Sequence, residues 1–423
     1  MPTDAQADAQ ALSHPAARAG TLYIISFVYF TFICYLSVGL PLAVLPPYVH
    51  LHMGFSATLA GLVISIQYFS TLISRPWAGR ICDRAGAKVS VLWGVAGCSL
   101  SGALLMAAAA LHSFAWLSLA TLLLSRLVLG VGESLGSTGS TLWGISSAGY
   151  AHTARVISFN GISTYGAMAL GAPLGVAIDL LCGSPQWGLA AIGLLILLLG
   201  LFSLVLASRK SPVRVVHGEH LPFRHIAIRI APHGMALALG GIGYSTLATF
   251  VTLFYLSRHW SGAALCLTAF GFAFVAARLL FMQTINRFGG FPVALACLSC
   301  ESLGVLLLWR AASPTMALCA AGLAGFGFSL VYPAIGVEAV KRVPTNNRGA
   351  ALGVFTAFAD VSFFLTGPIA GALIGHFGYP SAFLFALACV LTALGIVIIL
   401  RQMHLKMIAA ATPPAEILDP SEV

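Results

Sequence analysis

The chain has 423 residues, of which 59% are hydrophobic and only 8% are charged, and its mean hydropathy is +0.95. This composition excludes a soluble globular protein, because a chain that folds in water needs far more polar surface. The formal net charge of +9 does not indicate nucleic-acid binding, since the basic residues do not form a basic soluble domain.

Apolar blocks long enough to cross a bilayer follow one another along the chain, separated by polar residues or by glycine and proline. They are rich in Leu, Ala and Gly and lack the short alternating pattern of barrel strands. The expected spans are 21–45, 56–77, 89–111, 115–147, 156–181, 187–207, 232–257, 262–285, 291–311, 315–340, 349–375 and 380–401. The pattern predicts an all-α membrane protein with twelve transmembrane helices.

The polar segments divide the chain into two helical bundles and three connecting or terminal parts. These are an N-terminal tail over 1–20, a six-helix bundle over 21–207, a linker over 208–231, a second six-helix bundle over 232–401 and a C-terminal tail over 402–423. The first tail lacks the features of a signal peptide, so we expect the first span to remain uncleaved.

An even number of spans places both termini on one side of the membrane, and the basic residues indicate which side this is. Most of the 21 Lys and Arg residues fall in the tails, the linker and the loops of that same side. Cytoplasmic loops carry such an excess. We therefore expect a multi-pass membrane protein with both termini in the cytoplasm.

Landmarks that recur at a fixed separation indicate an internal repeat. At a separation of 195 residues the pairs are Gly130 with Gly325, Gly132 with Gly327 and Pro173 with Pro368. At a separation of 203 residues they are Arg75 with Arg278, Asp83-Arg84 with Asn286-Arg287 and Gly86 with Gly289. The two bundles are therefore predicted to be parallel six-helix pseudo-repeats.

The loop after the second span carries the most specific motif of the chain. Residues 79–88 read Gly-Arg-Ile-Cys-Asp-Arg-Ala-Gly-Ala-Lys and resemble the G-x-x-x-D-R-x-G-x-K signature of the major facilitator superfamily. Arg126, Gly130 and Gly132 match the R-x-x-x-G-x-G pattern of its fourth span, whereas 171–175 only approximates its antiporter motif. The resemblance implies two halves with a substrate site between them near the middle of the membrane.

Longer segments resemble the YfcJ/YhhS branch of bacterial inner-membrane carriers, which is arabinose-efflux-permease-like. The segments are Val38-Gly-Leu-Pro41 with Pro46, Gly132-Glu133-Ser134 with Thr141-Leu-Trp143-Gly144, and Val337-Glu338-Ala-Val-Lys341-Arg342-Val-Pro344. This resemblance implies a secondary active transporter that exports a sugar-like or drug-like solute by alternating access, coupled to protons. An importer of a small metabolite and a transport-inactive sensor with the same fold are the alternatives.

Ionisable residues at membrane depth are candidates for proton coupling, because each is costly there unless it is paired or hydrated. Arg126 and Glu133 are seven residues apart, so they share a helix face at a spacing of roughly 10 Å. Asp360 lies near the middle of the eleventh span, and Glu301 lies in the ninth, an outer span by the resemblance. A carboxyl that alternates between paired and unpaired states can bind and release a proton. We predict coupling through Glu133, Asp360 and Arg126, with a fixed salt bridge in the fourth span as the alternative.

The resemblance also implies a conformational gate at the loop motif and its second copy. The predicted gate residues are Gly79, Asp83, Arg84, Gly86, Lys88, Arg287 and Glu338. Asp83 would dock at the start of the eleventh span near 346–348, where a helix N-terminus favours a carboxylate. Because Asn286 replaces this acid in the second copy, Arg287 is expected to pair with Glu338. The alternative for both copies is an orientation signal with solvated charges.

Polar residues on the inner spans are expected either to line the substrate cavity or to pack between helices. The cavity candidates are Tyr35, Gln67, Asn160, Thr164, Tyr244 and Tyr332, and the predicted helix-bending residues are Pro41, Pro173 and Pro368. We find no P-loop, metal-ligand cluster or nucleophile–base set in the sequence, so we predict no enzyme activity, no cofactor and no resident metal. The expected partners of this monomer are a small-molecule substrate, protons and membrane lipid, with no nucleic acid.

Overall fold

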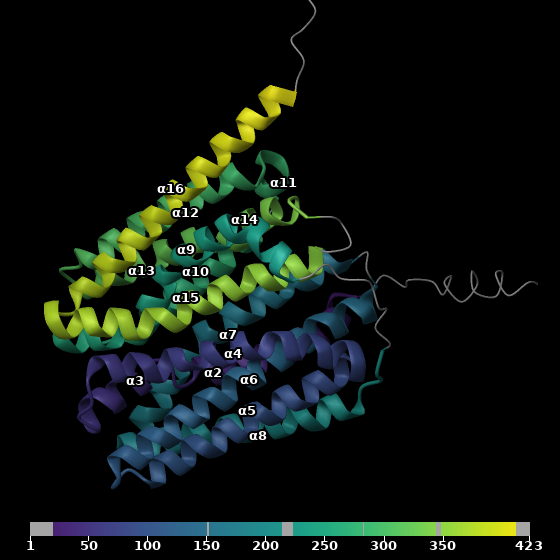
Figure 1. Ribbon diagram of the computed structural model, residues 1–423. Helices are drawn as coiled ribbons and strands as arrows, with labels where there is room; N and C mark the ends of the chain where they lie inside the picture. The colour runs from purple at the N-terminus through teal and green to yellow at the C-terminus, as the bar shows by residue number, and fades with distance from the viewer. Residues whose placement is uncertain (1–19, 150–151, 214–222, 282, 344–347, 412–423) are drawn as a thin grey trace, which may run out of the picture.

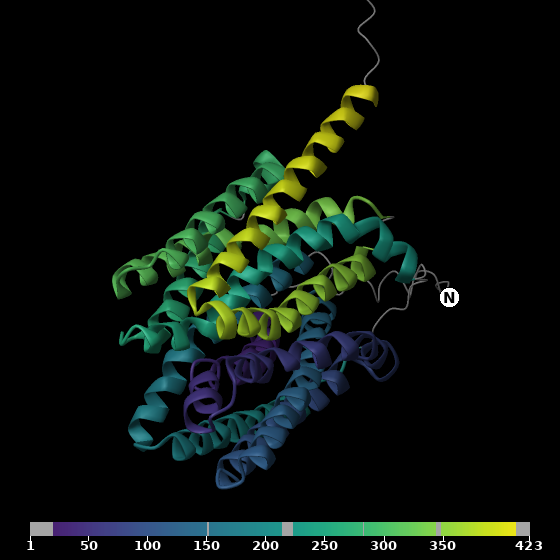
Figure 2. The same ribbon diagram turned by 60° about the vertical axis from the view of Figure 1, so that its left-hand side comes forward.

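The computed structural model describes residues 20–149, 152–213, 223–281, 283–343 and 348–411. For 83, 153–154, 223–226, 348–350, 352 and 408–411 only the backbone is described. These parts of the chain form helices joined by short turns, and they contain no strand. In Figures 1 and 2 the helices make two bundles, one running from purple to blue-teal and the other from teal-green to yellow.

The helices fall into an N-terminal and a C-terminal half. The first half contains α2 (Thr21–Gly39), α3 (Leu45–Pro47), the π-helical turn Tyr48–His52, α4 (Ala57–Ala85), α5 (Ala87–Ala110), α6 (Ala115–Ala148), α7 (Thr153–Cys182) and α8 (Pro185–Arg209). The second half contains α9 (Phe223–Ser257), α10 (Ala263–Phe281), α11 (Thr284–Phe288), α12 (Gly290–Trp309), α13 (Pro314–Phe328), α14 (Val331–Val340), α15 (Arg348–Phe377) and α16 (Pro380–Ala411).

Twelve helical segments of the described chain are long and apolar enough to cross a membrane, which confirms the predicted number of spans.

We call the end of the bundle where α8 ends and α9 begins the linker face, and the other end the opposite face. The predicted loop motif and its second copy each contain a turn at the linker face, at Gly86 and Gly289, with φ of 93° and 85°. Only glycine adopts such angles without strain, which explains why the repeat keeps it there.

The limits of several helices differ from the expected spans. The first helix ends at Gly39, and the tenth span is divided between α13 and α14. The helix α9 already begins at Phe223, within the expected linker 208–231, and α16 continues past 401 to Ala411. Hydropathy marks only the part of a helix that lies in hydrocarbon, whereas the helix itself can continue where polar side chains reach water.

The predicted bending residues occupy two kinds of position. Pro173 and Pro368 lie inside the continuous helices α7 and α15. Pro41 lies in the turn that follows α2, where the chain leaves the helix before α3. A proline inside a helix removes one backbone hydrogen bond, so Pro173 and Pro368 are points at which these helices can bend.

Packing inside each half depends on small residues, which let helix backbones approach closely. Such packing matters in a membrane because the hydrophobic effect contributes little to the association of helices in lipid. A Cβ added to Gly94 of α5 would lie 2.4 Å from the backbone nitrogen of Gly136 in α6. In the second half, a Cβ added to Gly304 of α12 would lie 2.5 Å from the backbone nitrogen of Ala324 in α13. The third and fourth spans of each half therefore meet in the same manner, as a repeat requires.

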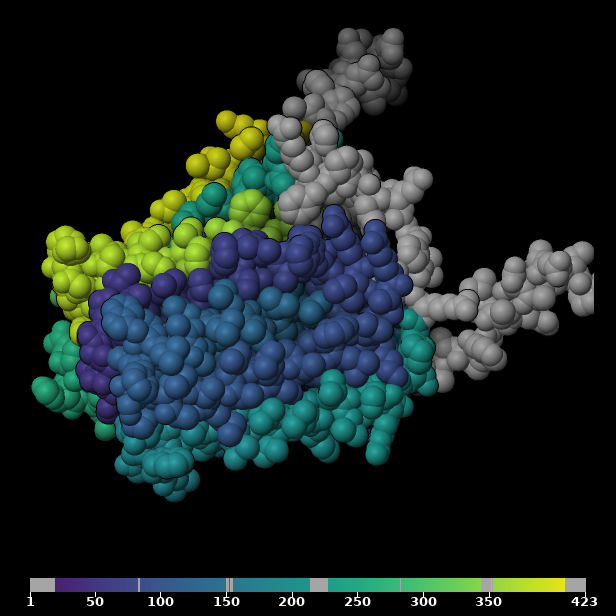
Figure 3. Space-filling view, turned by 60° about the horizontal axis from the view of Figure 1, so that its bottom comes forward, coloured from purple at the N-terminus to yellow at the C-terminus, as the bar shows by residue number. Residues whose placement is uncertain are grey.

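The two halves meet where α4 packs on α15 and where α7 packs on α10. In the space-filling view, α15 (yellow-green) lies directly against the purple segments of the first half (Figure 3). Near the opposite face, a Cβ added to Gly61 of α4 would lie 2.5 Å from the carbonyl oxygen of Gly367 in α15. Toward the linker face, a Cβ added to Gly79 of α4 or to Gly353 of α15 would have no atom within 4 Å. The seam between α4 and α15 is therefore closed at the opposite face.

Candidate substrate and coupling site

An ion pair between the two halves forms the centre of the site. Arg75 of α4 donates from Nε to Oδ2 of Asp360 in α15, and from Nη2 to Oδ1 at 3.0 Å. The Asp360 side chain is 5% exposed and that of Arg75 is 19% exposed, so the pair is largely removed from solvent. A two-pronged bond between guanidinium and carboxylate is strong and directional. Because each half supplies one partner, the bond joins the two halves of the protein.

The pair lies at the linker-face end of the packed seam. Moving from the opposite face, Gly61 first meets Gly367, and then the ring of Tyr68 contacts that of Phe363 with centroids 5.0 Å apart. Arg75 and Asp360 follow. The seam therefore has a tightly packed part near the opposite face and a charged contact at its linker-face end.

Arg75 was missed as a functional residue by the sequence reasoning, which used it only as a landmark of the repeat. The available signal was an arginine inside the second expected span, where any charged residue requires a partner. The partner itself has no sequence signal, since Asp360 lies 285 residues further along the chain.

Glu133 of α6 is 1% exposed and lies close to this pair. The hydroxyl of Thr71 donates to its Oε2 at 3.5 Å, and the hydroxyl of Tyr35 faces the same carboxyl. Glu133 is near enough to Asp360 and Arg75 for the three charges to interact. The structure thus brings both predicted coupling acids around one arginine.

The expected contact between Arg126 and Glu133 is not formed. Arg126 instead donates from Nη2 to Oε1 of Gln67 in α4, and its Nε and Nη1 have no hydrogen-bond partner among the described residues. Side chains along one helix lean in the same direction, so two turns of separation are not closed by their length. The fixed salt bridge within the fourth span is therefore wrong as an alternative.

A second buried arginine, Arg278 of α10, occupies the position in the second half that Arg75 occupies in the first. Its Nη2 donates to the carbonyl oxygen of Ser329 at 2.7 Å, where the chain passes from α13 to α14. Its guanidinium lies 4.8 Å from the ring centroid of Phe274 and against Gly161 of α7. Among the described residues, no carboxylate lies within 4 Å of it.

The cavity candidates lie around these two arginines. Tyr35 and Gln67 lie on the side of the coupling acids, as described above. Tyr332 lies near both arginines, and its hydroxyl is 2.7 Å from that of Thr356 in α15. On α7, Thr164 donates to the backbone oxygen of Asn160 at 3.0 Å.

Tyr244 belongs to an aromatic cluster between the halves. Its hydroxyl donates to the sulfur of Met168 at 2.7 Å, and its ring stacks with that of Phe328 at a centroid distance of 6.1 Å. Tyr165 of α7 joins the cluster through Phe274, with centroids 3.8 Å apart. The candidate site therefore combines buried charges with aromatic surfaces.

The first copy of the predicted gate is described only in part. The side chains of Asp83 and of 346–348 lie outside the described residues, and Arg84 is exposed. Lys88 donates to the backbone oxygens of Ser208 and Lys210 at 2.7 Å each. A lysine is well placed there, because the carbonyls at a helix C-terminus are free acceptors. Lys88 thus ties the loop motif to the end of α8.

The second copy of the gate differs from the expectation. Glu338 accepts from Nζ of Lys341 at 2.9 Å and from the backbone nitrogen of Gly290 at 3.0 Å, whereas Arg287 lies over the ring of Phe288. The predicted pair of Arg287 with Glu338 is therefore wrong. Lys341 is nearer because it lies one turn along the same helix, and Gly290 offers a free amide at the start of α12.

Glu301 lies inside the second half, away from the seam. It is 0% exposed, and neither carboxyl oxygen has a hydrogen-bond partner among the described residues. A Cβ added to Gly243 of α9 would lie 2.7 Å from its Oε1. The acid is therefore enclosed between α9 and α12.

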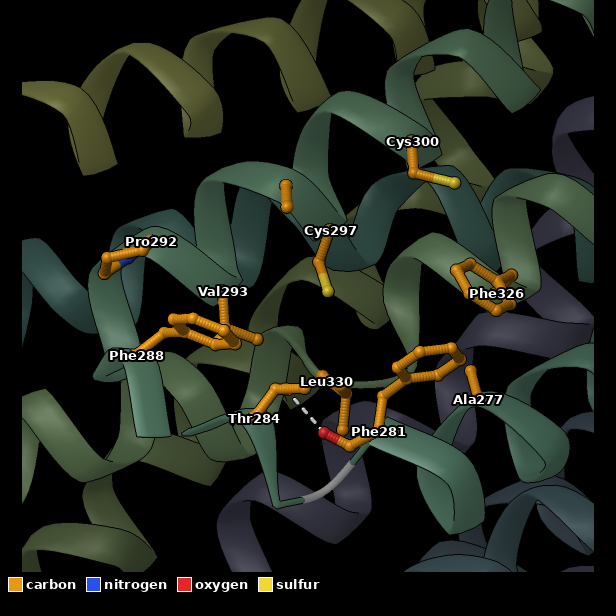
Figure 4. A pocket seen from close by; sticks show the side chains of 11 residues that line it. Ala277, Phe281, Thr284, Phe288, Pro292, Val293, Cys297, Cys300, Phe326 and Leu330 are labelled. Carbon is orange, nitrogen blue, oxygen red and sulfur yellow. Dashed lines mark hydrogen bonds between the residues drawn. The ribbon is translucent and has the colours of Figure 1, made fainter. Parts of the chain in front are cut away.

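An apolar pocket of about 300 Å³ lies between α10, α11, α12 and α13 (Figure 4). Phe281, Phe288 and Phe326 line it together with the thiols of Cys297 and Cys300, and none of the predicted site residues does. Over the described parts of the chain, His, Cys, Asp and Glu side chains do not gather in threes as metal ligands would. The pocket is thus separate from the charged site between the halves.

Two six-helix halves related by a repeat, with buried charges between them, define a membrane transporter that binds a small-molecule substrate. The chain belongs to the Major Facilitator Superfamily, whose family model matches residues 27–267 and 235–416. This membership confirms the resemblance to the superfamily and the expectation of a transporter rather than an enzyme.

Comparisons with individual proteins agree with this membership. A protein of Burkholderia pseudomallei (strain K96243), described as an uncharacterized MFS-type transporter, is 52% identical over 94% of this chain and 97% of its own. One of Pseudomonas aeruginosa (strain UCBPP-PA14), described in the same way, is 54% identical over 90% of this chain and 94% of its own. The crystal structure of a D-xylose-proton symporter matches the fold with a TM-score of 0.71 at 16% identity, over 88% of this chain and 97% of that one.

Proposed function

We propose that the protein is a secondary active transporter that moves a small organic solute, sugar-like or drug-like, across the bacterial inner membrane by alternating access coupled to protons. The observation that supports this most directly is the buried bond between Arg75 and Asp360, which joins the halves that alternating access must separate and rejoin. Protonation of Asp360 removes the charge that Arg75 binds and so loosens the seam.

A second acid gives the site the capacity to exchange its proton. Glu133 shares the charge of Arg75 with Asp360, so a proton on either carboxyl changes how strongly the other is held. Substrate binding or a change of state at the seam then alters proton affinity. This linkage is what coupling requires, because a ligand shifts an equilibrium only by its different affinity for the two states.

Export is the direction that the resemblance to efflux-type carriers supports. We expect residues 79–88 to bias the two access states from the loop at the linker face, where Lys88 is fixed to the end of α8. The protein would work as a monomer surrounded by lipid.

The linker face is proposed to be cytoplasmic. Because Ser211 follows α8 and His112 follows α5, the two residues lie at opposite ends of the bundle. Topology reporters fused at these positions should show opposite sidedness, with Ser211 in the cytoplasm. Reporters in the same compartment would contradict both the number of spans and the assignment.

Transport is tested with the purified protein in liposomes. Counterflow of labelled sugars, metallophores and drugs identifies an exchanged solute, and imposed pH gradients of both signs then measure coupling. We expect accumulation against the concentration gradient only with one sign of the pH gradient, which also gives the direction of transport. Exchange no faster than in protein-free liposomes for every solute would favour the transport-inactive sensor.

A further inference from the structure

Arg278 is buried without a counter-ion. The residue is 6% exposed, one nitrogen donates to Ser329, and Nε has no hydrogen-bond partner among the described residues. The acids whose side chains are described are Glu133, Asp179, Glu301, Glu338 and Asp360, and none lies within 4 Å of Arg278. A buried charge is costly unless another group compensates it.

The repeat relates Arg278 to the arginine that has a carboxylate partner. Arg278 corresponds to Arg75 at the separation of 203 residues, and both arginines reach across the boundary between the halves. Asp360, the partner of Arg75, corresponds to Tyr165 at the separation of 195 residues that also relates Pro173 to Pro368. The position that supplies a carboxylate to one arginine thus supplies a neutral tyrosine to the other.

On the α7 side, Arg278 is bordered by Gly161 and Tyr165. A Cβ on Gly161 would lie only 2.0 Å from its Nη1, so glycine is needed there to admit the guanidinium. Tyr165 is half-buried, and its ring stacks on Phe274, whose face also contacts the cation. One cation among aromatic rings suits an anion with an apolar or aromatic body.

We propose that the transported solute is an organic carboxylate, and that its carboxylate binds Arg278 in the place that Asp360 takes opposite Arg75. The inference names the substrate class of the proposed carrier and therefore rests on the proposed function. Arg278 accordingly has two tasks: one donor holds the carbonyl of Ser329 at the break between α13 and α14, and the remaining donors bind the solute.

The test installs the missing counter-ion. Tyr165→Asp would place a carboxylate next to Arg278 and compete with the solute, whereas Tyr165→Asn removes the same ring without adding a charge. Arg278→Gln removes the cation itself. The pair at Tyr165 remains informative even if Arg278→Gln does not fold, because it leaves the bond to Ser329 in place.

The measurement uses the purified full-length protein in detergent at constant ionic strength. Thermal unfolding is followed during titration with benzoate and acetate, and with their neutral isosteres benzamide and acetamide. In the wild type, we expect at least one anion to raise the unfolding temperature more than its amide. Because both variants at Tyr165 lose the ring, they are compared with each other: Tyr165→Asp should bind this anion about tenfold or more weakly than Tyr165→Asn. Arg278→Gln should bind it about tenfold or more weakly than the wild type, which is the scale of one lost charge-assisted bond.

Two outcomes would overturn the inference. One is that neither anion stabilises the wild type more than its amide. The other is that Tyr165→Asp and Tyr165→Asn bind the anion equally, whether both retain it or both lose it. The binding assay needs no gradient and no flux, so a negative result would count against the carboxylate site and not against proton-coupled transport. Conversely, intact anion binding without any flux in liposomes would count against the proposed function alone.

Discussion

Asp360→Asn is expected to reduce solute accumulation driven by a pH gradient to the level of protein-free liposomes. The carboxylate of Asp360 is the only one among the described residues that forms an ion pair across the boundary between the halves. A permanently neutral side chain mimics the protonated acid, so it can still pass between access states but cannot exchange a proton. Exchange of labelled for unlabelled solute should therefore survive.

The comparison uses the solute found by counterflow and three variants. Asp179→Asn is the matched control, because this acid lies in α7 outside the charged site and undergoes the same chemical change. Glu133→Gln should impair accumulation as well, since its carboxyl shares the charge of Arg75 with Asp360. Full accumulation in both Asp360→Asn and Glu133→Gln would rule out these acids as the coupling site and leave Glu301 as the leading candidate.

The state of the seam gives a second readout that needs no solute. Thr58 of α4 lies against Gly371 of α15, at the same end of the seam as the contact of Gly61 with Gly367. A cysteine placed at Thr58, in a variant whose native cysteines are replaced, therefore reports whether the seam is open. Because acid protonates Asp360 and weakens its bond to Arg75, lowering the pH should increase labelling of this cysteine relative to its labelling in the unfolded protein at the same pH, a reference that corrects for the smaller thiolate fraction. This pH dependence should be much smaller in the Asp360→Asn background. Equal pH dependence in both backgrounds would show that another group controls the seam.

Gly367→Ala is expected to open the seam at the opposite face and to slow transport about tenfold. A Cβ at this position would lie 2.3 Å from the carbonyl oxygen of Gly61, and the obstacle is backbone rather than a flexible side chain. The helices α4 and α15 would have to separate, which disfavours the state closed at that face. The access equilibrium therefore shifts toward the alternative state.

The cysteine at Thr58 again reports this shift, now at constant pH, and should be labelled faster in Gly367→Ala than in the parent. Gly375→Ala is the matched control, because it makes the same change in the same helix where nothing lies within 4 Å of the added Cβ. Unchanged labelling in Gly367→Ala, or the same increase in Gly375→Ala, would contradict a role of this close approach in closing the face.

The functional residues were only partly predictable, and the failures have a common cause. Glu133 and Asp360 were found because a carboxyl inside an apolar block is conspicuous in any sequence. The contacts of the buried arginines were not predicted. Arg126 contacts Gln67 and Arg75 contacts Asp360, and in each case the partner lies on another helix. Spacing along one helix says which residues share a face, but it does not say which neighbouring helix that face meets.

The sequence by itself determined the twelve helices, their division into two repeats and the family. Each of these follows from local properties: helix-length hydropathy, the glycines that a left-handed turn needs at Gly86 and Gly289, and a motif of ten residues at 79–88. The helix limits were less certain, because polar residues at the membrane surface can continue a helix beyond its apolar block.

Only the tertiary structure decided which charges are compensated. It pairs Arg75 with Asp360 across 285 residues of chain and leaves Arg278 facing Tyr165 and Phe274 at the equivalent place in the other half. The energetic cost of a charge in the membrane depends on the groups that surround it in space. Here those groups come from helices of opposite halves. The repeat makes the two arginines equivalent in sequence, and the packing of α4 on α15 and of α7 on α10 makes them different in chemistry.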